Sequence, residues 1–141
     1  MLFRSDIALA VNADGVHLGQ QDIPVALARQ ILGSQRIVGR STTSPDEMAL
    51  ALAEGADYIG VGTVYETPTK AGKAAAGLEY VQYAVKNATV PWFAIGGIDG
   101  NNINDVLQAG APGIAIVRAI MAADNPTQAV QYYLSVLNRV R

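Results

Sequence analysis

Short apolar runs and longer Ala- and Leu-rich stretches alternate along this chain. The short runs carry β-branched residues and lack a polar side, which is typical of strands buried in a parallel sheet. We expect strands at 15–18, 37–39, 58–62, 92–95 and 113–117. Between them, apolar residues at helical spacing predict helices at 25–32, 44–53, 101–109 and 126–140. This alternation indicates an α/β fold with parallel strands.

Local signals support these boundaries. Ser44 and Pro45, followed by two acidic residues, form a helix-start pattern. A weak repeat relates residues 53–61 to 108–116, and 12–16 is a shorter echo. In each copy a helix ends, a turn follows and a strand begins, so the chain is expected to consist of successive βα units.

The number of strands leaves two architectures open. Five parallel strands suit a flavodoxin-like open sheet, and they equally suit five units of a (β/α)8 barrel, the TIM-barrel type. No linker or low-complexity tract divides the chain, so we expect one domain over residues 1–141.

Composition removes several classes of function. Ten basic and twelve acidic side chains give a net charge of −2, which argues against general nucleic-acid binding. The absence of cysteine excludes disulfides, thiolate metal sites and thiol catalysis. No apolar run approaches the ~18 residues of a membrane span, so we expect a soluble, cytoplasmic protein with no membrane partner.

Candidate chemistry lies in the segments after the strands, where α/β proteins place their sites. Gly96 and Gly97 follow the fourth strand, and 117–120 resembles the first turn of a short helix. Such elements bind phosphate through main-chain N–H groups, although a glycine pair can also simply form a tight turn. The longest loop, 63–73, carries hydroxyls and a lysine suited to an anionic ligand, with a solvated surface excursion as the alternative.

Four further side chains, one histidine and three aspartates, can be interpreted from their place in the sequence. Asp22 could hold Mg2+ together with substrate oxygens, but from the residues alone a helix N-cap is favoured. His17, the only histidine, is expected to be a packed, hydrogen-bonded residue rather than a base. Asp14 and Asp57 precede strands and are interpreted as structural.

Five ordered segments together resemble one family: GVHLGQQD, GRSTT, ADYIGVGTVYETPTK, AIGGI and AIVRAI. They are similar to the thiamine-phosphate synthase (TMP synthase/TenI) family over nearly the whole chain from Asp6 onward. The resemblance implies a (β/α)8 barrel. It also implies a transferase that joins hydroxymethylpyrimidine diphosphate to thiazole phosphate, giving thiamine phosphate and pyrophosphate with Mg2+ as cofactor.

The same resemblance assigns roles to individual residues. Asp22 corresponds to a Mg2+ ligand, and Ser41 to the serine near the pyrimidine and the reacting centre. The thiazole phosphate would be held by the residues that match the family's phosphate site, namely Thr67, Thr69, Gly97, Val117 and Arg118. Lys70 corresponds to the lysine on the diphosphate, and Ser41 and Lys70 would be the catalytic pair. The family position at Arg118 is often Ser, which leaves the role of its side chain open.

Family members carry three βα units before this region, with a Gln-Leu-Arg-Glu-Lys strand and an Asn-Asp pair. The chain is therefore expected to be the C-terminal five-eighths of a barrel. By itself it is expected to be poorly soluble, self-associating or molten, and inactive. Two alternatives remain. One is a TenI-type thiazole tautomerase, which typically has a His where this chain has Ser41; the other is a non-catalytic phosphate-binding remnant or interaction module.

Overall fold

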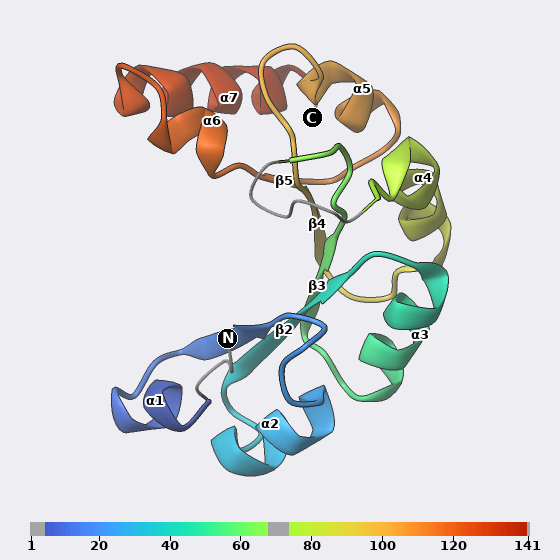
Figure 1. Ribbon diagram of the computed structural model, residues 1–141, viewed down its shortest axis with the longest axis vertical. Coiled ribbons are helices and arrows are strands. Elements are labelled where there is room, and N and C mark those ends of the chain that lie inside the picture. The colour runs from blue at the N-terminus through green and yellow to red at the C-terminus, as the bar shows by residue number, and fades with distance from the viewer. Residues whose placement is uncertain (1–4, 68–73, 141) are drawn as a thin grey trace. The chain divides into compact units, whose positions relative to one another are not determined.

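The computed structural model describes residues 5–67 and 74–140. Internal contacts group the chain into two compact units, residues 1–60 with 87–92 (unit 1) and residues 61–86 with 93–141 (unit 2). Helices and strands alternate, and the strands follow chain order, β1-β2-β3-β4-β5 (Figure 1). The strand pairs β1 with β2 and β4 with β5 are parallel. The predicted α/β class with parallel strands is confirmed.

Unit 1 is a sheet edge covered by short helices. Its elements are α1 (Ser5–Ala10), β1 (Gly15–Leu18), α2 (Val25–Leu32), β2 (Ile37–Thr42), α3 (Pro45–Ala53) and β3 (Tyr58–Val61), where Val61 belongs to unit 2. Helices α2 and α3 both contact β2. The core of the unit consists of almost completely buried side chains from both kinds of element. These are Leu18, Val38 and Ile59 from the strands and Val25 and Met48 from the helices.

The register of β1 and β2 decides which side chains share a face. His17 pairs with Gly39, and Val16 pairs with Val38. Because side chains alternate along a strand, Ser41 lies on the same face as His17 and Gly39. The opposite face, with Val16, Leu18 and Val38, is buried. Arg40, which pairs with Leu18, and Thr42 lie on this buried face too, and their side chains donate to the carbonyls of Ile23 and Gly60. The His17 face of the unit 1 sheet is thus the more accessible one, with polar side chains that are only partly buried.

Three helices end in the same turn. In α3 the N–H of Gly55 donates to the carbonyl of Leu52, and the N–H of Ala56 donates to that of Ala51. Gly110 and Ala111 repeat this pair of bonds after α5, and Asn12 and Ala13 repeat it after α1. This is the Schellman arrangement, whose C′ residue has positive φ. The φ angles of 83° at Gly55, 99° at Gly110 and 53° at Asn12 fit it, and they explain the repeat seen in the sequence.

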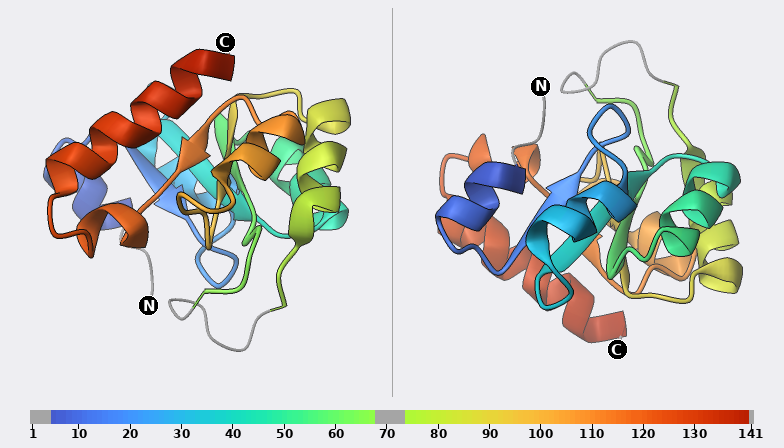
Figure 2. Two further views of the ribbon diagram at one scale, coloured as in Figure 1. Left: turned by 90° about the horizontal axis from the view of Figure 1, so that it is seen from above. Right: turned by 90° about the horizontal axis from the view of Figure 1, so that it is seen from below.

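Unit 2 is organised around the remaining strands. Its elements are α4 (Gly77–Asn87), β4 (Trp92–Ile95), α5 (Ile103–Gln108), β5 (Ile114–Ala115), α6 (Arg118–Met121) and α7 (Pro126–Val140), where Asn87 and Trp92 belong to unit 1. The long helix α7 packs against α5 and α6 (Figure 2). Val81, Ala84, Ile103 and Val106 are fully buried and form its core.

Several element boundaries agree with the sequence and others differ. The strands 15–18 and 92–95 and the helices 25–32 and 126–140 are confirmed. Ser44 is the expected N-cap, since its side chain accepts from the Glu47 N–H at 3.3 Å. Strand β2 extends to Thr42, whereas β5 is only two residues long because the chain turns into α6 at Arg118. The repeat at 12–16 indicated that a helix ends before β1, as α1 does, but gave no bounds for it, and α4 was not predicted.

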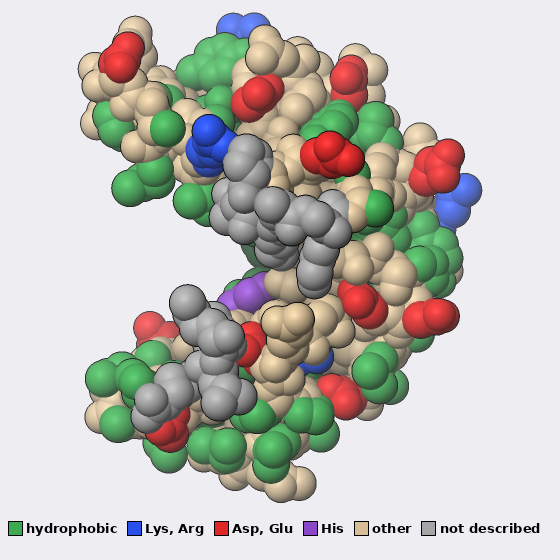
Figure 3. Space-filling view, in the orientation of Figure 1, with side chains coloured by type: hydrophobic (Ala, Val, Ile, Leu, Met, Phe, Trp, Pro, Cys, Tyr) green, Lys and Arg blue, Asp and Glu red, His purple; other side chains and the backbone are tan. Residues whose placement is uncertain are grey.

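Apolar side chains also remain on the surface of unit 1. The exposed ones on the first two helices are Ile7, Leu9 and Val11, in or just after α1, and Leu27 and Ile31 on α2. The two helices contact each other. Hydrophobic side chains, in green, are visible over this end of unit 1 in Figure 3. Within the described residues, none of the helices is both long and apolar enough to cross a membrane.

Candidate functional site

A pocket of about 460 Å3 opens in unit 2 beside the segments that follow three strands. Thr63, Glu66 and Thr67 come from the chain after β3, Gly96 to Asp99 from the loop after β4, and Ala115 to Ala119 from β5 and the start of α6. Parallel strands bring their carboxyl ends to one edge of a sheet, which is why residues distant in sequence meet here.

The loop after β4 can adopt its shape only because two glycines begin it. Gly96 and Gly97 have φ angles of 99° and 67°, which side chains with a Cβ rarely adopt. A Cβ at Gly96 would overlap Cγ2 of Thr63, and one at Gly97 would lie 2.6 Å from Cβ of Tyr65. The backbone therefore forms the pocket wall where any other residue would clash.

Side-chain hydrogen bonds brace this loop. The Asn102 amide donates to the Gly97 carbonyl at 2.8 Å, and its Oδ1 accepts from the Asp99 N–H at 2.9 Å. Asp99 in turn accepts from the Asn101 N–H at 2.8 Å. The main chain from Gly97 to Asn102 is thus held in place before any ligand arrives.

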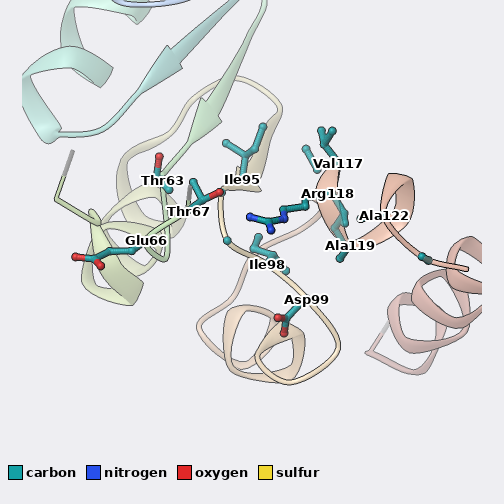
Figure 4. Close-up of a pocket in the computed structure, with 15 residues that line it drawn as sticks. Thr63, Glu66, Thr67, Ile95, Ile98, Asp99, Val117, Arg118, Ala119 and Ala122 are labelled. Carbon is teal, nitrogen blue, oxygen red and sulfur yellow. The ribbon is translucent and has the colours of Figure 1, made fainter. Parts of the chain in front are cut away.

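The charged groups around the pocket differ in direction. Arg118 extends from the start of α6 toward Thr67 and Ile98, while the carboxylate of Glu66 points away (Figure 4). The Arg118 side chain is exposed, so an anion in the pocket can reach its guanidinium group. Guanidinium and hydroxyl groups with main-chain N–H groups form the donor set typical of phosphate recognition.

Two tyrosines with buried side-chain atoms, Tyr65 and Tyr133, lie near Asp99 in this loop or Asp105 in α5. Burial, with the nearby Asp105 and Asp99, raises the pKa of Tyr65, and burial with Asp99 raises the pKa of Tyr133. Both phenols therefore stay neutral at physiological pH and add no negative charge beside the pocket.

Unit 1 holds a second group of polar residues, on the face of β1 and β2 that His17, Gly39 and Ser41 share. The Nε2 of His17 lies 2.8 Å from Oγ of Ser41, and its Nδ1 lies 2.9 Å from the Tyr58 hydroxyl. The side chain of Gln20 donates to the Ser41 carbonyl at 2.6 Å. The expectation that His17 is hydrogen-bonded is confirmed, but its direct link to Ser41 was not predicted.

Asp22 has a local role that differs from the N-cap favoured by the residues alone. Its Oδ2 accepts from the Gly19 N–H at 2.6 Å and closes the turn after β1. The N-cap of α2 is Pro24, with no side-chain cap. The N-cap interpretation was wrong, because the two residues between Asp22 and the helix place the carboxylate on the preceding turn.

The donor set around Asp22 limits what metal it could hold. Across 5–67 and 74–140 there is no group of three or more His, Cys, Asp or Glu residues that could hold a metal ion. A single carboxylate fits a Mg2+ bound mainly by substrate oxygens, and it does not fit a closed protein cage.

The residues named from the sequence thus fall into three sets. Thr67, Gly97, Val117 and Arg118 line one pocket. Asp22 and Ser41 lie in unit 1. Thr69 and Lys70 lie outside the described residues. Thr63 and Asn102 were not singled out from the sequence. Asn102 follows Gly97 by five residues, and an asparagine so soon after a glycine turn is a signal for a side chain that hydrogen-bonds the turn.

Comparisons with a family model, with relatives and with a solved structure match the chain to the same family. A family model described as thiamine monophosphate synthase matches residues 4–120. A thiamine-phosphate synthase of Nostoc punctiforme is 67% identical over 138 residues, which are 98% of this chain and 39% of the relative. One from Synechocystis sp. is 69% identical over 137 residues, 97% of this chain and 40% of the relative.

A solved structure gives the same result. It is a thiamine phosphate pyrophosphorylase from Pyrococcus furiosus, 38% identical with a TM-score of 0.87, and the match covers 97% of this chain and 65% of that one. The chain spans about two fifths of the length of the curated relatives.

Proposed function

The chain belongs to the thiamine monophosphate synthase family, and we propose that it is a part of a thiamine-phosphate synthase that carries the thiazole-phosphate half of the site. The reaction would join hydroxymethylpyrimidine diphosphate to thiazole phosphate and release pyrophosphate. The observation that carries the proposal is that Thr67, Gly97, Val117 and Arg118, each named from its family motif, line one pocket.

In this reaction the bond between the pyrimidine methylene and the diphosphate oxygen breaks, and its electron pair leaves with the diphosphate. The thiazole nitrogen then donates its lone pair to the methylene carbon. The pocket residues of unit 2 would hold the phosphate of the thiazole and so fix the position of its nitrogen. Holding the two reactants in line removes most of the entropic cost of their encounter.

The leaving diphosphate carries negative charge that must be stabilised. Lys70, by its motif, would contact the diphosphate, and Asp22 would hold Mg2+. When bound, Mg2+ would neutralise charge on the diphosphate oxygens. Ser41 would contact the pyrimidine substrate. We further propose that the enzyme acts in the cytoplasm, since its substrates are phosphorylated intermediates.

Binding to the pocket can be tested separately from turnover. Calorimetry with thiazole phosphate should show saturable binding to the chain, weakened about tenfold or more in Arg118→Ala. Arg139→Ala is the matched control, because Arg139 is exposed in the last turn of α7 and outside the pocket. Equal affinity in both variants would remove Arg118 from phosphate recognition, and absence of binding in the wild-type chain would contradict the assignment of the pocket.

Turnover is measured as pyrophosphate and thiamine phosphate formed from both substrates, in the chain and in the longer protein if the chain is part of one. Lys70→Ala should lower kcat, whereas unchanged turnover would exclude Lys70 from the reaction. An isomerised thiazole carboxylate phosphate without pyrophosphate release would instead indicate the tautomerase. Binding with no turnover in any form would indicate the phosphate-binding remnant.

The outermost strands in the sheet order, β1 and β5, also lead us to propose self-association of the 141-residue chain. Unpaired strand edges are templates for another chain. Size-exclusion chromatography with light scattering tests this, and a monomer at all concentrations would contradict it.

A further inference from the structure

The side chains of Tyr58, His17 and Ser41 form a chain of two hydrogen bonds in unit 1. The Tyr58 hydroxyl lies 2.9 Å from Nδ1 of His17, and Nε2 of the same ring lies 2.8 Å from Oγ of Ser41. Both nitrogens of the imidazole are therefore engaged. His17 connects a tyrosine at the start of β3 with a serine near the end of β2.

The sheet is shaped to allow this arrangement. His17 is in register with Gly39, and the Tyr58 ring lies directly against Gly39. A Cβ at Gly39 would overlap Cζ of Tyr58, so any side chain at this position would displace the ring. The missing side chain at residue 39 lets the Tyr58 hydroxyl reach His17.

The protons of the two bonds are coupled through the ring. A neutral imidazole has one N–H donor and one acceptor nitrogen. Burial raises the pKa of Tyr58, so the phenol keeps its proton at neutral pH. If Tyr58 donates to Nδ1, then Nε2 carries the ring proton and donates to Ser41.

We propose, on the basis of the proposed function, that His17 is a positioning residue that makes Ser41 a hydrogen-bond donor to the bound pyrimidine diphosphate. With Oγ accepting from Nε2–H, the hydrogen of Ser41 is directed to another acceptor. An Nε2 that already carries a proton cannot take one from Ser41. The pair therefore orients a donor, and it does not activate a serine nucleophile as the same two residue types do in hydrolases.

Because His17 is the only histidine, its ring nitrogens can be observed without assignment by mutation. Nitrogen NMR of protein labelled with 15N-histidine reports which ring nitrogen carries the proton. We expect the Nε2–H form at neutral pH, and Tyr58→Phe should increase the fraction of the Nδ1–H form. A wild-type ring in the Nδ1–H form, or doubly protonated at neutral pH, would overturn the proposal.

Two substitutions of His17 distinguish the role of Nε2 from that of Nδ1. The amide nitrogen of His17→Gln reaches the position of Nε2 and keeps a donor toward Ser41, while His17→Asn reaches only the position of Nδ1. We expect His17→Asn and Ser41→Ala each to lower kcat about tenfold or more, with KM for thiazole phosphate unchanged. His17→Gln should keep kcat within about threefold of the wild type.

Equal kcat in His17→Asn, His17→Gln and the wild type would overturn the positioning role while leaving the proposed function intact. Equal losses in both variants, with native circular dichroism, would indicate that His17 acts otherwise than as a donor to Ser41, and would also overturn it. The kcat values are measured in the longer protein if the chain is part of one. If neither the chain nor that longer protein shows turnover, the proposed function fails, and the NMR measurement still decides where the imidazole proton lies.

Discussion

Arg29 and Asp57 form an ion pair with an N–O distance of 2.6 Å that ties the last turn of α2 to the turn before β3. The same carboxylate oxygen accepts from the Val38 N–H at 2.7 Å. Burial opposes the charge of Asp57, but the hydrogen bonds from Arg29 and Val38 outweigh it and lower the pKa of Asp57. The aspartate expected to be structural is thus a junction between α2, β2 and β3.

Replacing Asp57 by Asn should therefore destabilise the protein in a pH-dependent way. Because the folded-state pKa is depressed, the stabilisation is present above the unfolded pKa of about 3.9 and is lost as pH falls through the folded value. The carboxylate is exposed, so we expect a loss of about 1 kcal/mol or less at pH 7. Urea unfolding between pH 7 and pH 3 should show the two proteins converging.

Asp14→Asn is the matched control, since Asp14 is exposed in the corresponding turn before β1. It should change the free energy of unfolding little at any pH. A loss in Asp57→Asn that persists unchanged at pH 3 would contradict the role assigned to the charge.

Adding a methyl group at Gly39 should be costly. A Cβ at Gly39 would overlap the Tyr58 ring, so the ring or the strand must move. Overpacking of this kind typically costs about 1–3 kcal/mol, and we expect Gly39→Ala to lower the free energy of unfolding by this amount. Gly100→Ala is the control, because its nearest contact would be an ordinary 3.5 Å to Tyr132. Equal stability of the two variants, measured by urea unfolding, would show that the ring is free to shift.

Gly97→Ala should lower the affinity of the pocket for its ligand more than it lowers the stability of the protein. Its φ of 67° and its approach to Tyr65 mean that the loop wall must move when a Cβ is added. We expect the Kd for thiazole phosphate to rise about tenfold or more. Gly110→Ala provides a comparison, since Gly110 also has positive φ and a close neighbour, Val85, but lies outside the pocket. It should lose stability and keep its affinity; calorimetry that finds the opposite order would refute the role of the loop.

Gly55→Ala tests the turn after α3 without a steric component. A Cβ added at this position would have no heavy atom within 4 Å beyond its chain neighbours, so only the φ of 83° opposes a side chain. The left-handed conformation costs roughly 1 kcal/mol for Ala and less for Asn. Thermal and urea unfolding should therefore rank the stability as wild type, then Gly55→Asn, then Gly55→Ala. Alanine as stable as glycine would contradict the turn geometry.

The sequence was sufficient for elements whose residues carry a strong local pattern. Strand 92–95 is an apolar run, strand 15–18 is apolar except for His17, and α3 begins after a capping serine with a proline. Helix α4 was not predicted, although Tyr80, Val81 and Ala84 form a buried stripe at helical spacing, because helices were expected in Ala- and Leu-rich stretches and this segment is rich in neither. Helix α1 is a single short segment whose apolar side chains are mostly exposed, so no buried stripe marks it.

The pocket was partly predictable and the hydrogen-bond chain was not. Strand order alone brings the segments containing Gly97 and Arg118 to one edge of the sheet. The link from Tyr58 through His17 to Ser41 depends instead on the register of His17 with Gly39 and on the space above that glycine. Register and side-chain contact arise only when three strands pack, and no local pattern in any one of them encodes it.

The shared turn after α1, α3 and α5 also has a consequence for recombination between relatives. Each turn is closed by two main-chain hydrogen bonds from residues 12 and 13, 55 and 56, or 110 and 111, and only the first residue of each pair needs positive φ. Since both bonds join main-chain atoms, the flanking residues can change without altering the turn that ends the helix. Crossovers placed just after residues 13, 56 and 111 would leave each turn whole, which makes them the favoured junctions for chimeric proteins assembled from βα units.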